Sequence, residues 1–464
     1  MQVIEGYVLL SKNEYDQLCK QVELLTARVK ELEAMLHKDS SNSSKPPSSD
    51  WYNKITKNRK QKSDKKIGGQ PGHEGETLEM VEHPDHLIEH KVEKCDHCGM
   101  DLSDVRAEKY HRRQVHDLPP VKIEVTEHRV EVKQCKVCGK TTIADCDVPA
   151  SVQYGEKIKS MAVYFNQYQF LPFERTKETM NDLFGCAMSA EVIKQSNEQC
   201  YERLEPVVEE QIKTSLINSA VMNCDETGLR CENDMQWVHS YSTDRHTYYA
   251  IDEKRGGEAM ERINILPRFK GICEHDRWAS YDQYEEMDHA LCNNHLMRDL
   301  EFVEEAYNKS WAEKMQNVLI EGLHLSRQEK MNKIALSALE TRYDRIVKKA
   351  IKEEPPAVIT EKKKRGRKAR SEPLKLAECF LHRKEDILRF LHDPRVPFGN
   401  NLAERDIRMI KLKQKISGCF RTRKGAEIFC RIRSYISTLK KQNKNVWDAL
   451  QLTIRAPSTQ LIAV

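Results

Sequence analysis

The order of apolar stretches between residues 217 and 293 constrains the fold of this chain more than any other feature. Alternating or continuous apolar residues predict strands at residues 219–223, 236–242, 247–251, 271–275 and 289–292, with a helix at 256–266. A crossover helix ahead of the fourth strand lets this strand run parallel to an earlier one in the same sheet. The sequence therefore predicts an α/β sheet.

Two aspartates follow strands that this order makes neighbours. Asp225 comes after the first strand and Asp276 after the fourth. Three strands, a crossover helix and further strands are the order of a ribonuclease-H-like fold. Carboxylates gathered at one edge of such a sheet can hold two divalent cations about 3.5–4 Å apart, which catalyse in-line displacement at phosphorus. Each aspartate could instead belong to a polar turn.

Glu404 is the third candidate carboxylate, and two interpretations of it stay open. Asn401-x-x-Glu404 before an apolar stretch is the pattern of a capping box, in which Glu404 would be structural. The same spacing places Asn401, Glu404 and Arg408 on one helix face, which would suit a metal and a phosphate. A long, mainly helical insertion at about residues 302–397 separates this helix from the sheet.

Composition describes a polar chain of several domains. Its 464 residues are 32% charged and 39% hydrophobic, and they are too many for a single core. No stretch approaches the roughly 20 apolar residues of a membrane-spanning helix, and the first residues lack a secretion signal. The 15 cysteines, an odd number, favour thiols and metal ligands over disulfides. We expect a cytoplasmic, nucleoid-associated protein with no membrane partner.

The N-terminal residues 1–38 have the pattern of a coiled coil. Apolar residues recur in steps of three and four, with valine at the a positions and leucine at the d positions: Val22 and Val29, and Leu18, Leu25 and Leu32. This choice favours a parallel dimer, although a short amphipathic helix folded onto its own chain has the same pattern. Residues 39–84 form a polar linker whose basic tract at 54–66 is either a solvated face or an arm for phosphates.

Two Cys-x-x-Cys pairs predict a zinc ribbon at residues 85–150. The pairs are Cys95 and Cys98, and Cys135 and Cys138, and a glycine follows each. Four thiolates suit a closed, structural Zn²⁺ site. Residues 121–126 and 130–132 alternate as strands do, so we expect a ribbon that brings the pairs together. Redox dithiols or unrelated core cysteines are the competing interpretations.

Residues 151–216 are expected to be helical and to include a helix-turn-helix. A helix at 174–184, a turn at Gly185 and an N-capping Ser189 produce this layout. The second helix would present Lys194 to a DNA groove. Corners of this kind also occur in ordinary helical bundles.

Two further basic tracts favour a polyanionic partner. One is an arm within the helical insertion, and the other follows Glu404. The residues that we expect to contact DNA are Lys364, Arg365 and Arg367 in the arm, and Arg408, Lys411, Lys413, Lys415, Arg421 and Arg423 after Glu404. Removing one of these phosphate-binding side chains should reduce the salt slope of DNA binding by about one unit.

Several motifs together resemble one family. They are residues 43–50 (SSKPPSSD), 68–73 (GGQPGH), the paired Cys-x-x-Cys, Tyr154-Gly155, Asp225-Glu226-Thr227 and residues 400–408 (NNLAERDIR). The chain resembles the large transposase subunit of bacterial insertion sequences of the IS66 type, within the DDE transposases. The resemblance implies a ribonuclease-H-like core, Asp225, Asp276 and Glu404 as the catalytic triad, and Mg²⁺ (or Mn²⁺) as the metal. Cys292-x-x-His295 also resembles an element of many DDE transposases, and we interpret it as structural rather than as a zinc site.

We therefore expect a metal-dependent DNA transposase. It would cut the ends of its element and transfer the 3′-hydroxyl into target DNA, with small accessory proteins as possible partners. A structure-selective nuclease and a non-enzymatic zinc and helix-turn-helix regulator are the alternatives. The expected domains are residues 1–38 (coiled coil), 39–84 (basic linker), 85–150 (zinc ribbon), 151–216 (helical DNA-binding region), 217–301 (first part of the core), 302–397 (helical insertion) and 398–464 (catalytic helix and basic C-terminal region).

Overall fold

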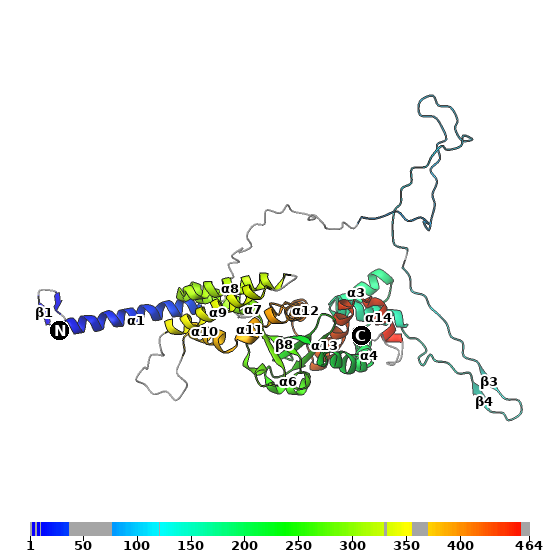
Figure 1. Ribbon diagram of the computed structural model, residues 1–464. Coiled ribbons are helices and arrows are strands. Elements are labelled where there is room, and N and C mark those ends of the chain that lie inside the picture. The colour runs from blue at the N-terminus through cyan, green and yellow to red at the C-terminus, as the bar shows by residue number, and fades with distance from the viewer. Residues whose placement is uncertain are drawn as a thin grey trace.

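The computed structural model describes residues 2–4, 7–9, 11–36, 77–119, 121–328, 332–354 and 370–455. Figure 1 shows a long N-terminal helix, a helical region, a sheet and a second group of helices in succession along one body. The basic tract at 54–66 and the arm that carries Lys364, Arg365 and Arg367 lie outside the described residues.

A five-stranded mixed sheet forms the centre of the body. Its strands are β5 (Val221–Cys231), β6 (Asp234–Ser242), β7 (Thr247–Asp252), β8 (Ile272–His275) and β9 (Asp288–Leu291), in the spatial order β7, β6, β5, β8, β9. The first three strands are antiparallel neighbours, whereas β5, β8 and β9 run parallel. The short helix α6 (Gly257–Ile263) and 3₁₀ turns at Leu266–Arg268 and Ala279–Tyr281 belong to the connections between strands. All five expected strands are present.

Strand β5 is longer than the sequence suggested. We expected it to end at residue 223, but it continues through Asp225 to Cys231. The polar residues after Asp225 pair with β6 rather than turning away, and the chain reverses only at Glu232 and Asn233. Both have positive φ, 53° and 71°, as a tight two-residue hairpin requires. Asp225 therefore lies within a strand and not after one.

Both edges of the sheet are covered. Along β7, helix α13 (Arg423–Lys441) supplies hydroxyls, so that the Tyr249 amide donates to Ser434 Oγ at 2.9 Å. Along β9, Arg389 of α11 (Lys384–His392) donates from Nε to the His289 carbonyl at 2.7 Å. Each of these hydrogen bonds satisfies a backbone group at one edge and ties the sheet to the helix beside it.

A helical group formed by residues 155–217 packs on α13 and α14 (Val446–Arg455). It consists of α2 (Glu156–Val163), a π-helical turn at Tyr164–Tyr168, α3 (Phe173–Phe184), α4 (Ala190–Arg203), a second π-helical stretch at Pro206–Ile212 and α5 (Lys213–Ile217). Gly185 ends α3 in the left-handed conformation with φ 63°, and Ser189 caps α4 by accepting from the Val192 amide. The helix, turn and capped helix are those expected from the sequence.

The expected insertion is helical. It comprises α7 (Asn293–Tyr307), α8 (Ser310–Ser326), α9 (Lys333–Glu353), α10 (Glu372–His382) and α11, which share one apolar core around the fully buried Trp311 and Phe380. After this insertion the chain returns to the sheet as α12 (Asn401–Ser417), which packs on β5 and β6. Residue 404 is thereby brought beside residue 225.

The N-terminal residues form two strands, β1 (Gln2–Ile4) and β2 (Tyr7–Leu9), and helix α1 (Lys12–Leu36), which reaches α7. The expected a and d positions of α1 are all exposed, between 46% and 66%. No helix in the described part of the chain is long and apolar enough to cross a lipid bilayer.

Residues 77–150 run as an extended trace with one small hairpin, β3 (Val132–Gln134) and β4 (Thr141–Ile143). The strand expected at 121–126 is not formed. Alternation alone did not produce a strand because these apolar side chains have no surface to pack on; Val125 is 89% exposed.

Candidate functional site

Asp225 lies within β5, and Asp276 directly follows β8, the neighbouring parallel strand. Asn223 of β5 pairs with Glu274 of β8, so two residues further along the same register Asp225 stands beside Asp276. Burial raises the pKa of Asp225 well above its usual value, and the negative charges of Glu226, Asp276 and Glu404 raise it further. Burial also raises the pKa of Asp276, against the opposing charge of Arg255. The structure thus gathers carboxylates that repel one another.

Glu226 adds a fourth carboxylate beside the two aspartates. Its side chain is 1% exposed and accepts a hydrogen bond from the Tyr281 hydroxyl. Burial, with a contribution from the charge of Asp276, raises its pKa to about 7. Glu226 is therefore a partly protonated neighbour of the cluster at neutral pH.

Arg255 is the cation that faces this cluster. Its Nη2 lies 3.4 Å from Glu226 Oε2 and 3.7 Å from Asp276 Oδ2. The guanidinium stacks on Trp278 at 3.7 Å and lies 5.1 Å from the ring of Trp237. Stacking on aromatic faces leaves the edge of a guanidinium free to bind oxygens. The two tryptophan rings thus hold the Arg255 guanidinium in place, and its edge remains available to bind carboxylates or phosphates.

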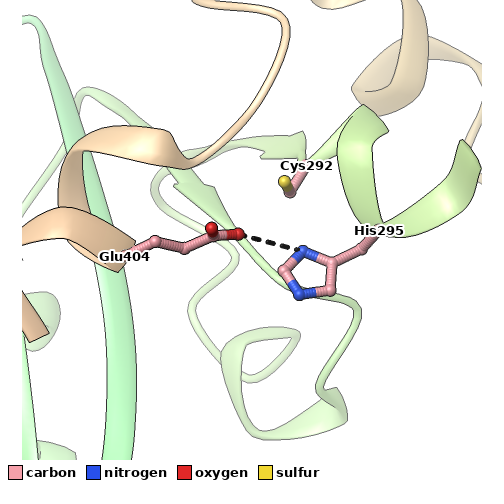
Figure 2. Close-up of side chains that lie close together, drawn as sticks. All are labelled: Cys292, His295 and Glu404. Atoms are coloured by element: carbon pink, nitrogen blue, oxygen red, sulfur yellow. Dashed lines mark ion pairs between the residues drawn. The ribbon is translucent and has the colours of Figure 1, made fainter. Parts of the chain in front are cut away.

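Glu404 stands in the first turn of α12, and its carboxylate points toward the start of α7 (Figure 2). Its Oε1 lies 3.8 Å from Nδ1 of His295 and 3.9 Å from Nη2 of Arg298. Burial lowers the pKa of His295 to about 4, so the imidazole is neutral at neutral pH. The contact between His295 and Glu404 is therefore not an ion pair.

The capping-box interpretation of Glu404 is wrong. The N-cap of α12 is Asn400, without a side-chain cap, and Asn401 accepts a hydrogen bond from Asn294 Nδ2 instead. Among the described residues, no set of ligand atoms from Asp225, Asp276 and Glu404 falls within 4.8 Å. Glu404 acts on Asp225 through its charge, and a change of its side-chain rotamer would be needed for all three to share an ion.

Asn400 ties together the elements that carry these side chains. Its Nδ2 donates to the Cys224 carbonyl at 2.6 Å, its Oδ1 accepts from Asn223 Nδ2 at 2.9 Å, and its amide donates to Cys292 Sγ at 3.1 Å. Asn223 Nδ2 also donates to Glu274 at 2.9 Å. All of these side chains are buried, so the network fixes the start of α12 against β5, β8 and the N-terminus of α7.

Glu274 in this network gives a pH-dependent prediction. Burial raises its pKa to about 8, so the folded protein binds a proton that the unfolded chain releases near pH 4.5. The stability associated with that proton is complete below pH 4.5 and is lost as the pH rises to about 8, at about 1.36 kcal/mol per pKa unit. Glu274→Gln, which keeps the acceptor for Asn223, should therefore be more stable than wild type by several kcal/mol at pH 8, and equally stable at pH 4. Urea unfolding at both pH values measures this, and an equal difference at both would contradict it.

The basic residues after Glu404 divide into two groups. Arg408, Lys415 and Arg421 are exposed, as DNA contacts require. Lys413 is buried at 8% exposure, and burial lowers its pKa to about 8. The expectation that Lys413 contacts DNA is wrong, because its position on α12 faces the helical group, where Nζ donates to the Asn166 carbonyl at 3.5 Å.

Other candidate DNA contacts are already engaged with protein groups. Lys411 Nζ donates to the Gly228 carbonyl. Arg423 Nη1 lies 3.1 Å from Glu253 Oε1. Lys194 is exposed on α4 but lies 3.4 Å from Glu191. These surface pairs are weak and exchangeable, whereas a lysine held by a backbone carbonyl is a poorer phosphate ligand.

Each Cys-x-x-Cys pair forms a tight turn suited to a metal. The Gly99 amide donates to the Cys95 carbonyl, and the Gly139 amide to the Cys135 carbonyl, both at 2.9 Å. Backbone hydrogen bonds lower the pKa of the first cysteine in each pair. The backbone of Cys98 contributes most at Cys95, and the backbone of Cys138 contributes most at Cys135. The lower pKa favours the thiolate. The two pairs are not brought within ligand distance of each other in the described residues.

Sequence reasoning missed Glu226, Arg255 and Asn400 as members of the site. Glu226 and Asn400 stand in stretches already singled out, next to Asp225 and ahead of Glu404. Arg255 carried no local signal, since its role comes from two tryptophans that approach it from β6 and from the segment after Asp276.

Comparison with protein families accounts for most of the chain. Residues 93–139, with all four cysteines of the turns, match the zinc-finger binding domain of transposase IS66, and residues 9–79 match a family of unknown function. The first match supports zinc and a DNA-processing class of protein. Residues 151–428 match the transposase IS66 family, a match that covers more than half of the chain, and the protein belongs to that family. No curated protein is significantly similar in sequence.

Proposed function

We propose that this transposase is a DDE enzyme in which Asp225, Asp276 and Glu404 bind divalent metal. The observation that carries the proposal is electrostatic. Burial raises the pKa of Asp225, and so do the carboxylates of Glu226 in β5, Asp276 just after β8 and Glu404 in α12. Like charges gathered at a half-buried place are unfavourable unless cations or protons compensate them. The sheet order β7, β6, β5, β8, β9 supports a ribonuclease-H-like core.

The donor set fits Mg²⁺. Carboxylate oxygens are the ligands that this hard cation prefers, and the one guanidinium of Arg255 lies near two carboxylates of the cluster, Glu226 and Asp276. When bound, Mg²⁺ would supply charge neutralisation at phosphorus and activation of the attacking oxygen. Asp225 and Asp276 would orient the ion from one sheet face, while Glu404 would complete its coordination after turning from His295.

The remaining residues would hold the DNA. Once a bound metal neutralises the carboxylates, the Arg255 guanidinium would be free to leave Asp276 and bind a phosphate. Arg408, Lys415 and Arg421 form the exposed basic surface on and after α12, where they would bind flanking phosphates. The exposed face of α4, with Lys194, would enter a groove as the second helix of a helix-turn-helix. Cleavage at the element end would release a 3′-hydroxyl, which then attacks target DNA.

A strand-transfer assay with precut element ends tests this function. The protein, Mg²⁺ and a precut end should yield joined products with target DNA. A structure-selective nuclease would cleave uncut substrate but leave precut ends unjoined. A regulator would bind the ends without any metal-dependent cleavage, and either result would refute the transposase mechanism.

We also propose that Cys95, Cys98, Cys135 and Cys138 share one Zn²⁺. Residues 77–150 expose apolar side chains, among them Val115 at 92% and Val137 at 97%, and a metal that joins the two turns would allow these to pack. Cys95→Ser should therefore bind one zinc fewer per chain and make this region more sensitive to protease, while Cys146→Ser should bind the wild-type amount. Elemental analysis and limited proteolysis check this, and unchanged zinc in Cys95→Ser would contradict it.

We propose a second copy of the chain as the partner of α1. Its valine and leucine stripe is exposed and continuous, with Leu25 at 66%, and its a and d pattern favours a parallel pair. Leu25→Asp should convert a dimer to a monomer in light scattering, whereas Glu23→Ala, on the same helix, should not. A monomeric wild type would refute the assignment.

A further inference from the structure

A second set of ligand atoms lies next to the proposed Mg²⁺ site. Cys292 Sγ, a ring nitrogen of His295 and a carboxylate oxygen of Glu404 all lie within 4.8 Å of one another, and Figure 2 shows the three side chains converging on one point. Cys292 follows β9 as the N-cap residue of α7, and His295 is in the first turn of α7. Glu404 comes from α12, so elements far apart in the sequence build the group.

The geometry and chemistry suit a zinc-class ion. Bonds of about 2.0–2.3 Å to nitrogen, oxygen and sulfur place tetrahedral ligands roughly 3.3–3.7 Å apart, and His295 Nδ1 and Glu404 Oε1 are already 3.8 Å apart. Thiolate and imidazole are softer donors than Mg²⁺ accepts, and they select Zn²⁺ or Co²⁺. A thiolate and a carboxylate also neutralise a divalent charge, which lowers the cost of burying it.

A second observation comes from Glu404 itself. Its Oε1 is buried and accepts no hydrogen bond from any described residue. A buried carboxylate oxygen without a donor is costly, and an ion at the centre of the group would satisfy it. Arg298 Nη2, 3.9 Å away, is too distant for a hydrogen bond, although its charge competes with a cation for the same carboxylate.

In place of the structural role that the sequence suggested for Cys292-x-x-His295, we propose that Cys292, His295 and Glu404 bind a zinc-class cation with one open position, and that this ion competes with Mg²⁺ for Glu404. When the ion binds, Cys292 releases its thiol proton to solvent, and its sulfur binds the metal as a thiolate. Bound zinc would hold the Glu404 carboxylate toward α7 and away from Asp225 and Asp276. The second part rests on the proposed function, whereas the binding site does not. Zinc would thus restrain the transposase by occupying its third acid.

Zinc content of the full-length protein tests the site without any DNA. Stripped protein is reloaded with Zn²⁺, and bound metal is counted after removal of the excess. Cys292→Ser, which keeps an acceptor for the Asn400 amide, and independently His295→Gln should each bind one zinc fewer per chain than wild type. Cys430→Ser, a change of another buried cysteine, should match wild type. Equal zinc in wild type and both ligand variants, with native circular dichroism, would overturn the proposal.

Cleavage at fixed Mg²⁺ with increasing Zn²⁺ tests the competition. Zinc should inhibit wild type, and a chelator at a concentration that spares Mg²⁺ should restore activity. Cys292→Ser should require at least about 10-fold more zinc for half inhibition, because even outer-shell changes cost a metal site about 10–100-fold. Equal sensitivity of the two proteins would overturn the competition. If neither protein cleaves under any condition, the proposed function fails, while the zinc counts still decide the site.

Discussion

Replacing Asp225 by asparagine is expected to lower the rate of DNA strand cleavage by about 10³-fold or more, a loss of at least about 4 kcal/mol of transition-state stabilisation. Asparagine keeps the size of the side chain and removes the charge that a divalent cation needs. Asp225 lies within β5 beside Asp276, so the substitution changes no strand pairing. Binding of the element end should remain close to wild type, since the basic residues that would contact phosphates are elsewhere.

Rates at saturating DNA and Mg²⁺ measure this loss, and a gel-shift titration measures end binding. Glu404→Gln should show the same separation of cleavage from binding. Asp244→Asn, at an exposed position in the β6–β7 turn, is the matched control and should cleave normally. Cleavage at the wild-type rate by both Asp225→Asn and Glu404→Gln would falsify the metal-site assignment.

The sequence predicted those parts of the fold that depend on residues close together along the chain. The strands of the central sheet and the helix that carries Glu404 follow from periodicity, and the corner between α3 and α4 follows from Gly185 and the capping Ser189. The extent of β5 could not be predicted in this way. Asp225-Glu226-Thr227-Gly228 has turn composition, and only its pairing with β6 makes it a strand.

The site depended on long-range contacts that no window of sequence contains. Glu404 meets His295 across the helical insertion, and Arg255 is positioned by Trp237 and Trp278. Lys413 shows that sequence can also suggest a contact that the fold does not allow. Its charge suggested a DNA contact, but its place on α12 turns the aliphatic stem inward, and the surroundings decide its role.

Asp406 is expected to be the most important single anchor of α12. Its Oδ2 accepts from Ser242 Oγ at 2.6 Å, from Thr247 Oγ1 at 3.1 Å and from Lys441 Nζ at 2.7 Å. These donors come from β6, β7 and α13, so one carboxylate fastens the helix to the sheet and to the helix that covers its edge. Asp406 lies two residues after Glu404 and thereby helps to fix where that carboxylate can reach.

Asp406→Ala should therefore destabilise the protein by about 3–5 kcal/mol, because it leaves the Lys441 ammonium, whose side chain is only 13% exposed, without its counter-charge and two hydroxyls without an acceptor. Chemical unfolding followed by circular dichroism measures the change, with Arg405→Ala, an exposed neighbour on the same helix, expected within about 0.5 kcal/mol of wild type. Under conditions where the Asp406→Ala protein is still folded, its cleavage rate should also fall, since α12 positions Glu404. A variant as stable as Arg405→Ala would show that packing alone holds α12, and Asp406 would then have no part in positioning the third acid.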